Sequence, residues 1–329
     1  MSTNRICIID PASHIPSLKL LFPEAEYFSH QPDHLFHYSH THHYSQSQIE
    51  SEYGFKFRTD WETIHSDTFD TVFIVAPLLD YYKGLTPSFT AHLSWMKRRI
   101  QTLLETGSFK KVVLFDIYDY DYDPSEINTD WKVDFYFKRN YQTTKAYAAN
   151  VFPFPYIMFV KPCVLKMCLS TSPSTYSINR AFWCGGLYDH SDPVNHVFRP
   201  RQQMYNQISK YIDTIPHCSY DTYLATMRSY KIGVDLIGVG DPNKRTLELL
   251  HHGVLMMTMC TDLAWGFEEG DSFHPDTLFK TADEFCVKLQ RLLTDEEHYK
   301  QCYTQQMYIT SKYFNKEWLR HFLCAKAGL

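Results

Sequence analysis

Lys244, Arg245 and Glu248 lie close together in the chain and carry the charges that can hold a phosphate ester and a ribose. The stretch LIGVGDPNKRTLELLHHGVLMM (236–257) reads as an apolar strand end, a glycine-bearing turn, a helix that begins around 243–246 and another apolar strand. Such a helix start favours anions, because its first N–H groups are unpaired and the helix dipole is positive there. The two cations suit a diphosphate, and Glu248, expected to be exposed, suits two ribose hydroxyls. A solvated helix face with a capped start is the alternative.

Two better-known phosphate motifs do not fit this turn. The P-loop pattern GxxxxGK[ST] fails, because Asn243 stands at the second glycine position after Gly238, and Arg245 follows Lys244. The dinucleotide fingerprint GxGxxG retains only Gly238 and Gly240. A Walker NTPase and an NAD-binding domain are therefore disfavoured.

Further sequence around this turn carries a family resemblance in the runs SYKIGVDLIGVGDPNKRTLELLHHGVLMM (229–257), LAWGFEEGDSF (263–273) and TADEFCVKLQRLLTDEEHY (281–299). These runs resemble the C-terminal nucleotide-sugar domain of GT-B glycosyltransferases. They are most similar to the exostosin-like group and to compact transferases of large DNA viruses. The resemblance covers residues 180–300 and implies that Arg245 contacts the donor diphosphate and Glu248 the ribose. Leu249 stands where the family usually has Ala, which leaves the donor sugar open.

Two other loops resemble parts of the same donor site. Gly185 and Gly186 follow an apolar strand, and a backbone without side chains lets a nucleotide-sugar approach closely. A plain tight turn is the alternative there. In WGFEEGD (265–271), the resemblance implies that Glu268 and Glu269 accept hydrogen bonds from sugar hydroxyls.

In the first half of the chain, Asp116 ends the apolar run of VVLFDIYDYDYD (112–123). Carboxyl ends of parallel strands line the ligand cleft of open α/β sheets, so Asp116 is the first candidate for the base of an inverting transfer. A strand-end turn is the alternative. Asp119 and Asp121 also form a DxD, which would hold Mn²⁺ against a diphosphate in a metal-dependent GT-A glycosyltransferase. That second interpretation leaves the 229–257 motif unexplained.

A histidine-rich run, HQPDHLFHYSHTHHY (30–44), invites a metal interpretation. It has no HExxH pattern and no nearby cysteine, so no metal ligands are predicted here or elsewhere. Its mixture of aromatic and polar side chains favours contact with an acceptor sugar. His37 and His40 are the candidate acceptor-binding residues.

The elements that must position these residues alternate between strands and helices. Near-continuous apolar runs with helical segments between them indicate a parallel sheet covered on both faces. The helical segment TAHLSWMKRRIQTLLETG (90–107) ends at Gly107, a plausible C-terminal cap. The strand-like runs of the first half are RICIID (5–10), DTVFIVAP (70–77), KKVVLFDIYD (110–119) and VDFYFKR (133–139).

A second series of elements follows a Pro-, Ser- and Thr-rich stretch at 152–180. It contains a helix at 199–213 and strands at 231–238 and 253–259. The predicted fold class is α/β, with two Rossmann-like domains facing across a cleft as in GT-B. We expect residues 1–170 to form the acceptor domain and residues 171–329 the donor domain. The last helix, 313–323, can cross back to the first domain.

Composition limits the function further. The length of 329 residues suits two domains of about 100–200 residues. A net charge of -5 disfavours a nucleic-acid partner, which requires clustered Lys and Arg. Nine cysteines without a CxxC pair favour free thiols in a reducing compartment, and no apolar run reaches the ~18 residues of a membrane span. A cytoplasmic location without a transmembrane segment is predicted.

The sequence as a whole predicts a hexosyl- or pentosyltransferase that moves sugar from a nucleotide-sugar to a hydroxyl of a glycan or glycoprotein. No cofactor and no metal are expected. The alternatives are the GT-A enzyme that uses residues 119–123 and a non-catalytic protein that binds a nucleotide or glycan. The donor base, the acceptor, the stereochemistry and the oligomeric state are not predicted.

Overall fold

The structure, a computed structural model, divides the chain into two compact units that are treated separately. Unit 1 comprises residues 1–162 and 316–329, and unit 2 comprises residues 163–315. The predicted boundary at residue 170 falls outside the described residues. Those are 5–10, 15, 17–29, 46–75, 98–116, 132–154, 176–187, 199–216, 218–237 and 243–329, without the side chains of Gln48 and Lys244.

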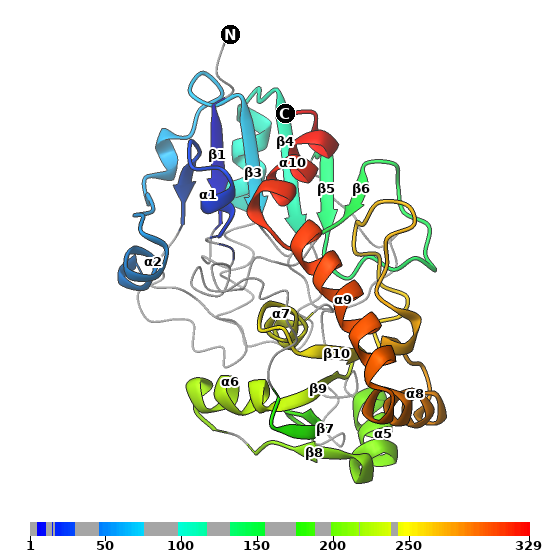
Figure 1. Cartoon of the computed structure of the whole chain (residues 1–329). Helices are drawn as coiled ribbons and strands as arrows, with labels where there is room; N and C mark the ends of the chain where they lie inside the picture. Colours follow the sequence, from blue (N-terminus) through cyan, green and yellow to red (C-terminus); the bar gives the residue numbers. More distant parts are fainter. Residues whose placement is uncertain are drawn as a thin grey trace. The chain divides into compact units, whose positions relative to one another are not determined.

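Unit 1 contains a six-stranded sheet with the order β2-β1-β3-β4-β5-β6, and its pairings are all parallel (Figure 1). The order reverses at β1, because β2 pairs on one side of it and β3 on the other. The strands are β1 (Ile6–Ile9), β2 (Glu26–Phe28), β3 (Thr71–Val75), β4 (Lys111–Asp116), β5 (Phe135–Lys138) and β6 (Val151–Pro153).

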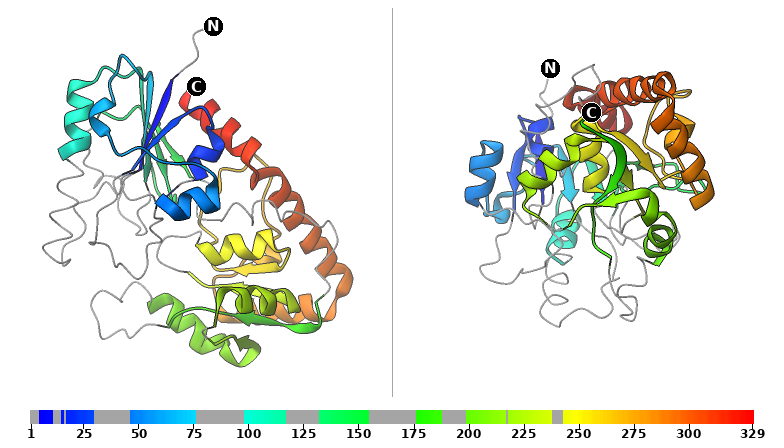
Figure 2. Two further views of the ribbon diagram at one scale, coloured as in Figure 1. Left: turned by 90° about the vertical axis from the view of Figure 1, so that its left-hand side faces the viewer. Right: turned by 60° about the horizontal axis from the view of Figure 1, so that its bottom comes forward.

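Both faces of this sheet are covered, as its near-continuous apolar strands require. One face packs Val72 and Leu114 against Ile100 of the helical residues 98–106. On the opposite face, the rings of Phe22 and Phe73 lie 4.9 Å apart in an edge-to-face contact. Figure 2 shows the helical residues 98–106 and α10 on opposite sides of the sheet. The other helical segments are α1 (Ser17–Leu21), α2 (Gln46–Tyr53) and η1 (Trp61–Thr63).

Helix α10 (Lys316–Ala327) belongs to unit 1, although it follows all of unit 2 in the sequence. Arg320 binds the carbonyl oxygen of Leu21 at 2.6 Å and the carboxylate of Glu24 at 2.6 Å. The ring of Phe322 lies 6.2 Å from that of Phe137 in β5. The end of the chain thus completes the apolar layer over the first sheet.

Unit 2 contains a four-stranded parallel sheet with the order β10-β9-β7-β8. The order reverses at β7, so the carboxyl ends of β7 and β9 meet at the position where open α/β sheets bind ligands. Its strands are β7 (Ile178–Trp183), β8 (Ile212–Thr214), β9 (Tyr230–Asp235) and β10 (Leu255–Thr258). Its helical segments are α5 (Arg199–Ile208), η4 (Ser209–Tyr211), α6 (Tyr220–Ser229), α7 (Lys244–His251), η5 (Pro275–Thr277), α8 (Ala282–Thr294) and α9 (Glu296–Tyr313).

The second sheet is also buried on both faces. Trp183 and Val234 share a core cluster with Phe285 of α8. On the other face, α7 lies so close to β9 that a Cβ atom at Gly233 would collide with the Leu249 side chain. The glycine in the strand therefore sets how near α7 can approach the sheet.

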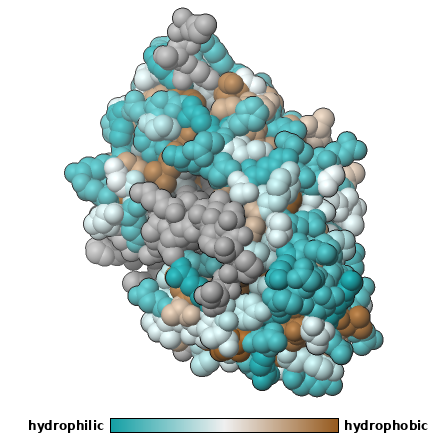
Figure 3. All heavy atoms as spheres, in the orientation of Figure 1, coloured by the Kyte–Doolittle hydropathy of each residue, from teal (hydrophilic) through white to brown (hydrophobic). Residues whose placement is uncertain are grey.

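On the face shown in Figure 3, the described part is mostly hydrophilic, with apolar residues in small, scattered groups. None of the described helices is both long and apolar enough to cross a membrane. None of the cysteines in the described part forms a disulfide bond. The cytoplasmic location stays a prediction.

Candidate functional site

The start of α7 is fixed to the end of β9 by Asp235, which is fully buried. Its carboxylate accepts hydrogen bonds from Asn243 Nδ2 at 2.9 Å and from Thr246 Oγ1 at 2.5 Å. Asn243 caps the helix, because its Oδ1 accepts from the N–H groups of Arg245 and Thr246 at 2.9 and 3.3 Å. These two N–H groups are therefore satisfied within the protein. The expectation that they are unpaired at the helix start is wrong, so the argument for an anion site depends on the Arg245 side chain.

The guanidinium group of Arg245 is largely buried, with 15% of the side chain exposed. Its central carbon lies 5.5 Å from the ring centroid of Trp183. Its Nη1 lies 3.9 Å from Asp235 Oδ1, beyond hydrogen-bond distance, and has no hydrogen-bond partner among the described residues. A buried donor left unpaired costs about 1–3 kcal/mol, which an anionic ligand would recover. Arg245 thus offers a charged, unsatisfied donor.

Gly185 makes room for that guanidinium. A Cβ atom at this position would lie 2.5 Å from Arg245 Nη2 and 2.7 Å from the Trp183 ring. The carbonyl of the next residue, Gly186, accepts a hydrogen bond from Arg201 Nη1 at 3.3 Å. Arg201 also donates from Nε to the carbonyl of Ile237 at 2.8 Å, so one side chain of α5 joins the loops after β7 and β9.

Glu248 is 5% exposed, so the expectation of an exposed acid is wrong. It lies on the same helix as Arg245, one turn further on, near Tyr223 of α6. Burial, followed by the charge of Glu248, raises the pKa of the Tyr223 phenol. Burial also raises the pKa of Cys184, and the Arg245 charge opposes that rise. The structure therefore brings Arg245, Glu248 and the loop at Gly185 together, as the donor-site hypothesis requires.

Glu268 and Glu269 are both exposed. The Glu268 carboxylate accepts from Lys312 Nζ at 2.8 Å, and Asp271 accepts from the same ammonium at 2.7 Å. These bonds raise the pKa of Lys312, with Asp271 as the larger cause. The loop is thereby tied to α9, and sugar binding by its two glutamates stays a prediction.

Asp116 lies at the end of β4 in unit 1 and is fully buried. Its Oδ2 accepts a hydrogen bond from Tyr136 Oη at 2.7 Å and lies 4.0 Å from Nζ of the equally buried Lys138. This environment suits a structural ion pair, so the catalytic role stays a prediction. His37, His40 and the DxD at 119–123 lie outside the described residues, as does the side chain of Lys244.

Three residues around the site were not predicted from the sequence. Asp235 and Arg201 hold the loops in place, and Trp183 forms the surface beneath Arg245. The only signal for Asp235 was its place, an acid closing an apolar run after Val234. Arg201 gave no signal, because its partners are backbone carbonyls.

Comparison with known proteins identifies the fold. No family model and no curated protein matches the chain. An α-glucosyltransferase in complex with UDP and a 13-mer DNA containing a central A:G mismatch aligns with a TM-score of 0.55 and 12% identity, over 99% of this chain and 100% of that one. A second α-glucosyltransferase complex, with UDP and a 13-mer DNA containing an HMU base, aligns with a TM-score of 0.51 and 12% identity, over 99% of each chain.

These neighbours and the two parallel sheets define an α/β protein with two Rossmann-like domains of the GT-B glycosyltransferase type. The predicted α/β class with two Rossmann-like domains of the GT-B type is confirmed, and the architecture favours GT-B over the GT-A alternative. The exostosin-like and viral resemblance stays a prediction.

Proposed function

We propose that the chain is a glycosyltransferase that takes its sugar from a nucleotide-sugar. The donor diphosphate binds Arg245, and the donor ribose binds Glu248. The observation that carries this proposal is the buried Arg245 guanidinium, whose Nη1 has no hydrogen-bond partner among the described residues. It lies beside Gly185, where the order of the second sheet reverses. A charge-assisted, bidentate bond to phosphate is the interaction for which a guanidinium group is best suited.

The proposed reaction transfers a hexosyl or pentosyl group to a hydroxyl of a glycan or glycoprotein, without a metal ion. A guanidinium beside the diphosphate can neutralise charge on the leaving nucleotide, which is the task of a metal in other transferases. The two structural neighbours were solved with UDP, so UDP is the first nucleotide to test. Both were also solved with DNA. The net charge of -5 opposes DNA as acceptor here.

The donor site is tested by calorimetric titration of UDP, GDP and ADP into the wild-type protein and Arg245→Ala. Loss of a charge-assisted bond of about 1.5–3 kcal/mol should weaken the preferred nucleotide by about ten- to 150-fold. Arg180→Ala is the matched control, since Arg180 is a half-exposed arginine of the same unit paired with Asp213. Equal affinity in folded Arg245→Ala and wild-type protein would overturn the site assignment.

Turnover is tested separately with a panel of nucleotide-sugars. Slow hydrolysis of one donor without acceptor, lost in Arg245→Ala, would support an enzyme. Nucleotide binding without hydrolysis or transfer would favour the non-catalytic alternative. Glycans, glycoproteins and duplex DNA then serve as acceptors, and transfer to DNA alone would contradict the proposed acceptor class.

A further inference from the structure

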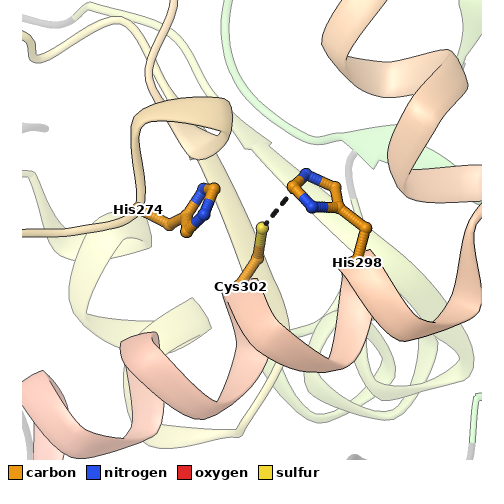
Figure 4. A group of neighbouring side chains, drawn as sticks. All are labelled: His274, His298 and Cys302. Carbon is orange, nitrogen blue, oxygen red and sulfur yellow. Dashed lines mark hydrogen bonds between the residues drawn. The ribbon is translucent and has the colours of Figure 1, made fainter.

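Three side chains with metal-ligand atoms lie together in unit 2, apart from the residues of the proposed donor site. His298 and Cys302 are four residues apart on α9, and His274 is the residue before η5. One possible ligand atom from each lies within 4.8 Å of the other two. Figure 4 shows the three side chains directed toward one another from two separate segments of the chain.

The spacing of these atoms is close to that of a zinc site. His298 Nε2 lies 3.6 Å from Cys302 Sγ. Around a tetrahedral zinc ion with bonds of about 2.1 Å to nitrogen and 2.3 Å to sulfur, these atoms would be about 3.5 Å apart. The ligand atom of His274 lies within 4.8 Å of the other two, so it must move by at most about 1.5 Å to reach the separation of tetrahedral ligands. Two ligands are thus already at the required separation.

The environment of the cluster also suits a bound ion. Cys302 is fully buried and His298 is 6% exposed, while His274 is half-buried and leaves a route from solvent. Asp276 adds a carboxylate, whose Oδ2 lies 2.7 Å from His298 Nε2. Arg291 Nη1 also contacts that oxygen, at 3.0 Å. Thiolate, imidazole and carboxylate in a tetrahedral arrangement are the ligands that zinc prefers.

We propose that His274, His298 and Cys302 form a structural zinc site, with Asp276 or water as the fourth ligand. The ion joins the segment that follows β10 to α9. Cys302 binds as the thiolate and releases its proton to solvent, and the two histidines bind as neutral imidazoles. The spacing of His298 and Cys302 on one helix face fixes two ligands, and the η5 segment supplies the others.

Metal binding replaces hydrogen bonds within the cluster. His274 Nδ1 accepts from the N–H of Asp276 at 3.1 Å, and His298 Nε2 donates to Asp276 Oδ2 at 2.7 Å. Zinc binding at His298 Nε2 requires its proton to move to Nδ1, and zinc binding at His274 Nδ1 uses the lone pair that now accepts from Asp276. Because each hydrogen bond contributes little net stability compared with a structural zinc site, the exchange favours the metal.

Metal content is measured on the purified full chain after dialysis against zinc and then against metal-free buffer. The wild-type protein should retain one more equivalent of zinc than Cys302→Ser. Cys286→Ser, which alters a partly exposed thiol of α8, is the matched control and should retain as much zinc as the wild type. Zinc at 100 times its dissociation constant should raise the wild-type melting temperature by about 5–10 °C.

The histidine-rich residues 30–43 could bind zinc on their own, so cobalt distinguishes the two sites. Co²⁺ bound to Cys302 should give a thiolate-to-cobalt charge-transfer band in the wild type and in Cys286→Ser. The band should be absent in Cys302→Ser, whereas histidine-bound cobalt gives none. If Cys302→Ser retains as much zinc as the wild type, or if the wild type lacks the band, the proposal is overturned.

Discussion

At the scale of single residues, Glu248 is both buried and part of the proposed donor site, so its substitution should change ligand binding and stability together. In the proposed site it accepts hydrogen bonds from the 2′- and 3′-hydroxyls of the donor ribose. Glu248→Gln should therefore reduce the preference for UDP over 2′-deoxy-UDP by about tenfold, the effect of a charged hydrogen bond. Calorimetric titration of both nucleotides measures this preference.

Because Glu248 is 5% exposed, the same variant should also lower the melting temperature. Glu317→Gln is the control, since Glu317 is 73% exposed and should change neither quantity. An unchanged preference for the ribonucleotide in Glu248→Gln would place the ribose elsewhere. A change in melting temperature alone would make Glu248 a structural residue.

Two alternative roles for Asp116, the predicted catalytic base and a structural anion, can be separated with a double variant. If Asp116 is the base of an inverting transfer, Asp116→Asn should lower kcat by about 10²–10⁴ and leave nucleotide affinity unchanged. If Asp116 is instead a structural anion, the same change removes a carboxylate that lies 4.0 Å from the Nζ atom of the buried Lys138, and loss of one member of a buried ion pair costs about 3–5 kcal/mol. Activity assays and urea unfolding of Asp116→Asn measure both effects.

The double variant Asp116→Asn/Lys138→Met removes both charges of this pair. It should recover stability in either case, because the buried pair is then neutral. Recovery of transfer activity together with stability would rule out Asp116 as the base. A retained configuration at the sugar's anomeric carbon would have the same meaning.

The sequence pointed to the charged candidates Arg245 and Glu248, but not to the residues that hold their helix in position. Arg245 and Glu248 stood out because cations at a helix start and an acid one turn later have an evident chemistry. Asp235 could not be ranked in this way, since its importance depends on its bonds to Asn243 and Thr246. Burial is a property of the packed chain, which is why Glu248 was expected to be exposed.

At the scale of elements, the C-terminal end of α7 makes a pH-dependent contribution to stability. Burial lowers the pKa of His251 to about 4, and burial followed by the charge of Arg228 lowers the pKa of His252 to about 4. Arg228 Nη2 donates to His252 Nδ1 at 2.7 Å, which a proton on that nitrogen would prevent. The helix dipole favours protonation here by only about 0.3–1 kcal/mol, so burial outweighs it.

Both histidines have folded pKa values below the unfolded value of about 6.5. As pH falls from about 6.5 to 4, the unfolded chain binds protons that the folded protein does not, so stability decreases. Each histidine contributes on the order of 1.4 kcal/mol per pH unit. Urea unfolding at pH 7, 5.5 and 4.5 should show a shallower pH dependence in His252→Gln than in the wild type. His321→Gln, at an exposed position of α10, is the control, and equal slopes in all three proteins would contradict the prediction.

Long elements were predictable from sequence, and short ones were not. The runs at 5–10, 70–77 and 110–119 contain β1, β3 and β4, because buried parallel strands give continuous apolar runs. β2 was missed, because three residues show no periodicity. The expected helix at 199–213 is wrong at its end, where Ile212–Thr214 form β8 beside β7.

At the scale of the whole molecule, the role of metals can be divided between catalysis and stability. Transfer should continue in excess EDTA over minutes, because in the proposed donor site Arg245 neutralises the charge of the leaving diphosphate. Slow loss of activity during long incubation would reflect removal of structural zinc, and Cys302→Ser should not show this slow phase. Rates with EDTA alone and with added Mn²⁺ measure the difference. Immediate and complete loss, restored by Mn²⁺, would support the metal-dependent alternative at 119–123.

The place of α10 in unit 1 has a consequence for synthesis on the ribosome. Phe22 and Phe137 are covered in part by a helix that begins at residue 316, after all of unit 2 has been made. At about 5–20 residues per second, the ribosome needs roughly 8–30 s to move from residue 162 to residue 316. The first sheet therefore emerges from the ribosome long before its apolar layer can close. A nascent chain halted before residue 316 should bind chaperones through that layer, and a chain halted after α10 has emerged should not.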